Sequence, residues 1–165
     1  MASTTELIKE LRERTGAGIM ECKRAIDESN SDLNAAEKLL KEWGLATAAK
    51  KAGREASQGL IDSYIHAGRI GAMVEVNCET DFVARTDDFR TFAREVAMQV
   101  AATSPSRISG SDPSNNGSDS DVPLLDQQYI RDPSKTVQDL LNETIAKLRE
   151  NVVIRRVARF ELGGG

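Results

Sequence analysis

The spacing of apolar side chains changes along this chain, and that change limits the fold class. Over residues 1–43 the apolar positions recur at helical spacing. Residues 60–65 and 70–78 predict instead the two strands of a hairpin, the second with a clear period of two. Helical spacing returns from Thr86, and residues 152–162 predict a closing strand. Such an order is typical of α+β proteins, so we expect a small antiparallel sheet packed with helices.

Residues 1–43 predict three short helices that together form a small domain. Ser3 or Thr4 can cap the first helix, and Ser31 can cap the third. The second helix is expected to have one apolar face, made by Ile19, Met20, Cys22, Ala25 and Ile26. A unit of this size buries little apolar surface, so we expect it to be only marginally stable by itself.

The remaining chain is divided by composition. Residues 44–55 are rich in alanine and lack a broad apolar face, which predicts a connector helix before a core domain of residues 56–165. Within that domain a further helix is predicted over residues 137–151. In residues 103–121, seventeen of the nineteen positions are Ser, Thr, Gly, Pro, Asn or Asp. That segment cannot bury enough apolar surface to offset the entropy of ordering it, so it is predicted to be a flexible loop.

Charge and composition argue against several function classes. With 26 acidic and 22 basic side chains the net charge is −4, which argues against a nucleic-acid partner. A single histidine, His66, removes most metal-site and serine-hydrolase chemistry, so we expect no enzyme activity, metal or cofactor. No apolar run reaches the roughly 20 residues of a membrane span, so we expect a cytoplasmic protein with no membrane partner. Cys22 and Cys78 are expected to be small core residues rather than nucleophiles.

The segment after the predicted strand 70–78 follows no periodic pattern. There, Asp81 and Phe82 place a carboxylate and a large ring on a corner before the next helix. In a structural interpretation, Thr80 or Asp81 caps a turn and Phe82 packs as a hydrophobic staple. In a functional interpretation, the acid and the ring are exposed and enter a pocket on a partner protein. The residue pattern alone leaves both interpretations open.

Two long motifs in this chain resemble those of the translation elongation factor Ts family. One is residues 11–26, LRERTGAGIMECKRAI, and the other is residues 75–85, EVNCETDFVAR, with the Thr-Asp-Phe-Val core at residues 80–83. Their order and spacing also fit the family. Further similarity in residues 48–53, 132–137 and 150–156 extends the resemblance over nearly the whole chain except residues 103–121.

The resemblance implies a guanine-nucleotide exchange factor for elongation factor Tu, a GTPase. It implies that one set of residues enters the GTPase near its magnesium and phosphates and promotes GDP release: Thr80, Asp81, Phe82 and Val83. It also implies that the N-terminal helices form a ubiquitin-associated-type domain that docks on the GTPase. The residues expected at that contact are Arg12, Ile19, Met20 and Lys23. In the alternative interpretation of this second set, Ile19 and Met20 belong to the core and the two cations are a solvated face.

The chain also departs from longer members of that family. It has room for one core module where longer members carry two, and the polar residues 103–121 stand where other members often have a helical insertion. Since short members can dimerise, the resemblance implies a possible homodimer through the core domain, with the closing strand as a sheet edge. Two other functions stay open: a ubiquitin-associated-type interaction module without exchange activity, and a small RNA-binding protein that uses Arg155, Arg156 and Arg159.

Overall fold

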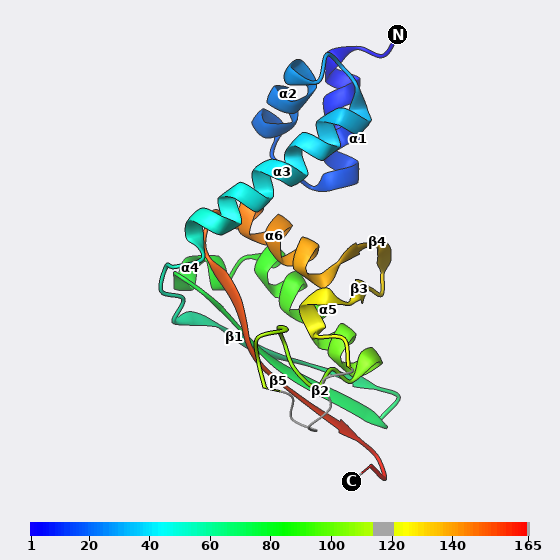
Figure 1. The fold of residues 1–165 in the computed structure, drawn as a ribbon, viewed down its shortest axis with the longest axis vertical. Coiled ribbons are helices and arrows are strands. Elements are labelled where there is room, and N and C mark those ends of the chain that lie inside the picture. Colours follow the sequence, from blue (N-terminus) through cyan, green and yellow to red (C-terminus); the bar gives the residue numbers. More distant parts are fainter. Residues whose placement is uncertain (114–120, 165) are drawn as a thin grey trace.

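A computed structural model of the chain describes residues 1–113 and 121–164 (Figure 1). Three helices form one end of the elongated molecule, and antiparallel strands packed with helices form the rest. The predicted fold class is therefore confirmed. Each part has its own cluster of buried apolar side chains, with Leu11 and Ile26 in the first and Phe89 in the second.

The N-terminal end consists of three helices, α1 (Thr4–Thr15), α2 (Ile19–Glu28) and α3 (Leu33–Lys51). Ser3 caps α1, as one of the two predicted caps, because its Oγ accepts a hydrogen bond from the backbone N–H of Glu6. The prediction that Ser31 caps α3 is wrong. Ser31 has a φ of 67°, whereas an N-cap needs extended backbone, and Asp32 supplies both that conformation and the accepting carboxylate.

The predicted connector helix is not a separate element. It is the second half of α3, which continues without a break to Lys51 and ends before the predicted limit of residues 44–55. This half packs on the core part of the molecule: Gly44 is buried, and a Cβ atom placed on it would lie 3.7 Å from Cβ of Ala146 in α6 (Val137–Leu148). The domain boundaries themselves stay predictions.

An antiparallel sheet of three strands supports the core part. Its strands are β1 (Gln58–His66), β2 (Ile70–Cys78) and β5 (Val152–Glu161), in the order β1-β2-β5. The three predicted strands are confirmed, although β1 begins earlier than the apolar pattern indicated. Alternate residues of the central strand are buried beneath the helices, namely Ala72, Val74, Val76 and Cys78.

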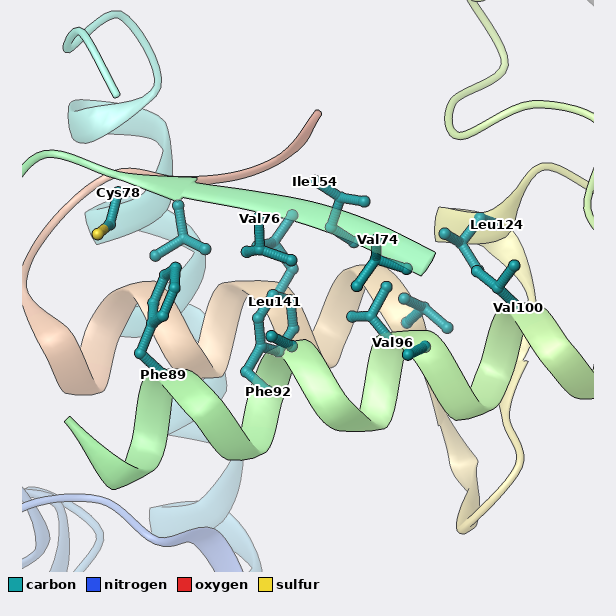
Figure 2. Close-up of a cluster of buried hydrophobic side chains, with 14 of the residues drawn as sticks. Val74, Val76, Cys78, Phe89, Phe92, Val96, Val100, Leu124, Leu141 and Ile154 are labelled. Carbon is teal, nitrogen blue, oxygen red and sulfur yellow. The ribbon is translucent and has the colours of Figure 1, made fainter. Parts of the chain in front are cut away.

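The helices α5 (Asp87–Thr103) and α6 cover one face of this sheet (Figure 1). Figure 2 shows Phe89, Phe92 and Val96 of α5 directed at β2, with Leu141 of α6 beside them. The Phe89 ring is completely buried. The core thus contains two aromatic rings of α5 among aliphatic side chains, and it fixes the end of β2 from which the next helix begins.

Three short elements between α5 and α6 were not predicted. They are a 3₁₀ turn, η1 (Leu124–Asp126), and the hairpin strands β3 (Gln128–Tyr129) and β4 (Asp132–Thr136). The buried side chain of Gln99 holds the hairpin: its Nε2 donates to the carbonyl of Gln128 at 3.1 Å, and its Oε1 accepts from the backbone N–H of Ile130 at 3.0 Å. A long-range bond of this kind leaves no periodic signal in the sequence.

The polar segment 103–121 is only partly described, because residues 114–120 lie outside the described part of the chain. Within the described part, the carbonyl of Ile108 accepts a hydrogen bond from the backbone N–H of Leu125 at 3.0 Å. The flexibility of the segment as a whole stays a prediction.

The face of the sheet opposite α5 and α6 carries exposed apolar side chains. The largest are Ile61, Ile65, Met73 and Phe160, each more than half exposed. Strand pairing places Gly71 between Ile65 on β1 and Phe160 on β5, so these two side chains lie on either side of a position without a side chain. We refer to the four residues as the outer sheet face.

Candidate partner-binding site

The Thr-Asp-Phe-Val motif forms a corner between the end of β2 and a single helical turn, α4 (Asp81–Ala84). Thr80 is the N-cap of that turn, and its Oγ1 accepts from the backbone N–H of Val83 at 3.3 Å. We call residues 79–84 the corner segment. The structural interpretation of this motif is therefore correct for Thr80.

It is wrong for Phe82, whose side chain is 76% exposed and does not act as a staple. Asp81 is exposed beside it and forms an ion pair with Arg85 at 3.2 Å. Val83 is half-buried against the core cluster, and Ala84 is buried. The corner segment thus has an inner side, which anchors it, and an outer side that presents the carboxylate of Asp81 and the ring of Phe82 to solvent.

The corner segment is also tied to the start of β5, far away in the sequence. The carboxylate of Glu150 accepts hydrogen bonds from the backbone N–H groups of Glu79 and Thr80, at 3.1 and 3.0 Å. It also accepts one from the Thr80 hydroxyl at 2.7 Å. Glu150 was not predicted as a site residue, because a single acidic residue between a helix and a strand carries no recognisable pattern.

The second predicted set of site residues lies on the N-terminal helices, apart from the corner segment (Figure 1). Ile19 and Met20 begin α2 and are 56% and 73% exposed, so their predicted place on a buried face is wrong. Arg12 and Lys23 are exposed as well. The rest of that predicted face, Cys22, Ala25 and Ile26, is buried as expected. Exposure in the first turn of α2 is thus confined to particular side chains, since Cys22 in the same turn is fully buried.

The described part of the chain offers little support for a metal site or a reactive cysteine. No group of three or more His, Cys, Asp or Glu side chains there could hold a metal ion, and none of the described helices is long and apolar enough to cross a membrane. The Nδ1 atom of His66 lies 3.0 Å from the Tyr64 hydroxyl. Both cysteines are fully buried, and burial raises the pKa of the Cys78 thiol to about 11 and also raises that of Cys22. The two thiols are therefore poor nucleophiles at neutral pH.

The three arginines of β5 are engaged within the protein. Arg155 and Arg156 both form ion pairs with Glu75, at 3.5 and 2.8 Å, and Arg159 donates to the carbonyl of Ala101 at 3.0 Å. A nucleic-acid surface needs cations that are free to contact phosphates. The pairing with Glu75 therefore weakens the RNA-binding alternative.

A cleft of about 580 Å³ lies between the N-terminal helices and the face formed by α5 and α6. Lys41 of α3 forms an ion pair with Asp139 of α6 across the cleft at 3.6 Å, and Lys147 of α6 forms one with Asp88 of α5 on the core side at 3.1 Å. The cleft is therefore lined by charges of both signs, which largely neutralise each other. It does not contain the corner segment or the exposed residues of α2.

An exposed ring on an anchored corner, with no assembled acid, base or metal group in the described residues, is typical of proteins that act by contact with a partner. The family model of elongation factor TS matches two overlapping parts of the chain, residues 44–120 and 79–165. The chain belongs to the elongation factor Ts family, which acts in translation elongation.

Individual relatives agree with this assignment. The chain is 51% identical to elongation factor Ts of Thermoanaerobacter sp. (strain X514) and to that of Caldanaerobacter subterraneus subsp. tengcongensis, with 98% of the chain covered in both comparisons. The matches cover 96% and 98% of those two proteins. Elongation factor Ts of Carboxydothermus hydrogenoformans is 47% identical over 98% of the chain and 90% of the relative. Similarity therefore extends beyond the two motifs to both parts of the fold.

Proposed function

We propose that this protein is a guanine-nucleotide exchange factor for elongation factor Tu and acts in the cytoplasm on the GDP-bound form of that GTPase. The observation that carries the proposal is the exposure of Phe82 on a corner that Thr80, Val83 and Ala84 anchor. A large aromatic ring held on an anchored corner is the kind of side chain that serves as an anchor in a partner's pocket. Membership of the elongation factor Ts family supplies the partner.

The proposed mechanism is displacement rather than covalent chemistry. GTPases hold GDP largely through Mg²⁺ and backbone donors around the phosphates. The Phe82 ring enters beside those loops and moves them, while the carboxylate of Asp81 perturbs the polar contacts near the metal. Thr80 and Val83 fix the corner from behind, through the helix cap and the core contact described above. Because binding of the two ligands is reciprocal, GDP must weaken binding of the factor by the same ratio.

The N-terminal helices provide a second contact in this proposal. Ile19 and Met20 are the apolar anchors, and Arg12 and Lys23 are nearby cations that can pair with acidic groups of the GTPase. An anchor of this kind raises the local concentration of the corner segment near the nucleotide site. It adds affinity without taking part in GDP release.

Release of a fluorescent GDP analogue from the cognate elongation factor Tu tests the proposed function. With unlabelled GDP in excess, we expect the release rate to rise with the concentration of this protein, by more than about tenfold at saturation. Titration in the presence and absence of GDP should show the matching loss of affinity for the factor. Measurable binding without faster release would contradict the exchange proposal and favour a ubiquitin-associated-type module without exchange activity.

We further propose that the core part forms a homodimer through the outer sheet face. The four apolar side chains there are 54% to 79% exposed, and β5 is an edge strand that leaves its outer side unpaired within the sheet. A second copy would cover the same residues with its own, as in a two-fold symmetric interface. Glu75 lies opposite Ile61 on the central strand, and its ion pair with Arg156 at 2.8 Å means that it would enter this interface already paired.

Sedimentation equilibrium tests the dimer. We expect the wild-type protein to have twice the mass of the 18.0 kDa chain, and Phe160→Asp to have the mass of one chain, because a carboxylate cannot be buried unpaired in an apolar interface. Phe82→Ala is the control and should stay dimeric, since Phe82 is not part of the outer sheet face. A monomeric wild-type protein at the highest concentration used for exchange would refute the dimer.

A further inference from the structure

We propose that Glu150 is a positioning residue for the corner segment and that it sets the orientation in which Asp81 and Phe82 are presented to the partner. The expected effect of Glu150 on GDP release rests on the proposed exchange function, whereas its hydrogen bonds to the corner segment do not. Glu150 touches neither ring nor carboxylate of that pair in the described contacts. It acts through the backbone of residues 79 and 80 and through the hydroxyl of Thr80.

The bonds between the two segments are reciprocal. The backbone pairing of β2 with β5 stops at Cys78 and Val152. Beyond that point, the Glu150 carboxylate accepts from the backbone N–H of Glu79, and the Glu79 carboxylate accepts from the backbone N–H of Asn151 at 2.7 Å. Hydrogen bonds to side-chain oxygens thus continue to link the two segments beyond the last backbone pair of the strands. Such charge-assisted bonds are stronger than neutral ones, so they hold the two segments at a fixed separation.

The side chain of Thr80 links these bonds to α4, the helical turn that bears the Phe82 ring. The Thr80 hydroxyl donates to Glu150 and accepts from the backbone N–H of Val83, so one rotamer of Thr80 serves both bonds. A helix as short as α4 has no stability of its own, because a first turn costs more conformational entropy than its few hydrogen bonds return. Its conformation therefore depends on contacts from outside. Val83 provides an apolar contact and Thr80 provides the polar one.

Glu150 is itself held in place by its neighbours. Arg149 ends α6 in the left-handed conformation, with φ of 60°, so the helix predicted to reach residue 151 ends at Leu148 and the chain turns sharply. The carbonyl of Arg149 accepts from Nζ of Lys51, and the Nδ2 atom of Asn151 donates to the carbonyl of Arg54, both at 2.8 Å. The residues on either side of Glu150 are thus fixed to the chain that follows α3.

Hydrogen exchange tests the geometry without any partner. In Glu150→Ala, the backbone amides of Glu79, Thr80 and Val83 should exchange at least about tenfold faster than in the wild-type protein. Amides in the middle of α5 should keep their rates. Glu143→Ala is the matched control: it removes another acidic side chain with an ion pair, to Lys135 at 2.9 Å, and should leave the corner amides unchanged.

Nucleotide exchange tests the consequence. Glu150→Ala should lower the second-order rate constant for stimulated GDP release roughly tenfold, because a corner that is correctly placed a tenth of the time binds with a tenth of the affinity. In the Phe82→Ala background the same substitution should cost clearly less than tenfold, since only the Asp81 carboxylate is left to position. Glu150→Gln keeps one accepting oxygen for the backbone amides and should recover part of the rate.

The outcomes separate this proposal from the proposed function. If the corner amides exchange no faster in Glu150→Ala, Glu150 does not position the corner. Faster amide exchange with unchanged GDP release, or equal losses of GDP release with and without Phe82, would also overturn the proposal. If the wild-type protein fails to accelerate GDP release, the exchange function fails, and the positioning role is then decided by the amide rates alone.

Discussion

Replacing Phe82 by alanine should lower the second-order rate constant for stimulated GDP release by at least about thirtyfold. Truncation of a central aromatic anchor commonly costs about 2 kcal/mol or more of binding free energy, and 1.4 kcal/mol corresponds to a factor of ten. The ring is 76% exposed in the free protein, so its removal takes away little internal packing. The melting temperature should therefore change by no more than about 2 °C, given the usual effect of a surface substitution.

Ile130→Ala is the matched control for this substitution. Ile130 is another exposed apolar residue, at the turn between β3 and β4, and it lies outside the corner segment. Its truncation should leave the exchange rate within about twofold of the wild-type value. If Phe82→Ala were as active as Ile130→Ala, the ring would not enter the partner, and the exchange mechanism would pass to Asp81 or to the N-terminal helices.

Gly59→Ala should destabilise the core by at least about 4 kcal/mol, which is a large part of the total stability of most domains. Gly59 has a φ of 146° and pairs with Asn77 on the central strand. A Cβ atom at this position would lie 2.7 Å from Cα of Asn77 and still closer to the carbonyl oxygen of Val76. Both are backbone atoms of β2, so the contact cannot be relieved by a change of rotamer. The edge strand β1 would have to leave the sheet.

Urea unfolding followed by circular dichroism measures that loss. Gly53→Ala is the control, because a Cβ atom there meets no other atom within 4 Å, and its free energy of unfolding should stay within about 0.5 kcal/mol of the wild-type value. A loss below about 1 kcal/mol for Gly59→Ala would mean that β1 can shift away from β2 without breaking the sheet. Since β2 leads directly into the corner segment, Gly59→Ala should also reduce exchange activity.

Much of the fold could be predicted because local patterns and tertiary packing agree. The period of two in β2 and the helical spacing of α5 are imposed by one buried layer, so the sequence carries both signals. Errors arose where a contact between distant residues decided the outcome. α3 continues past the predicted break and packs on α6 there, with Gly44 buried at the contact, and the short strands of the β3–β4 hairpin depend on Gln99.

The candidate site was predictable in part for the same reason. Asp81 and Phe82 stand out because they interrupt a regular pattern, yet only the structure distinguishes an exposed ring from a buried staple. Ile19 and Met20 show the opposite case, since the apolar pattern predicted burial for two side chains that are more than half exposed. Glu150 could not be found from the sequence, because its partners lie some 70 residues away in the chain.

Because α3 is unbroken, it fixes the distance between the two proposed partner contacts. A helix of 19 residues is about 28 Å long, at 1.5 Å per residue, and its end is fastened by Lys51 to the segment that carries Glu150. The distance between Met20 on the N-terminal helices and Phe82 is therefore set by a continuous helix and not by a flexible linker. Under the proposed function, a GTPase with the right two surfaces at the wrong spacing could engage one of them but not both, so the length of α3 would help to determine specificity.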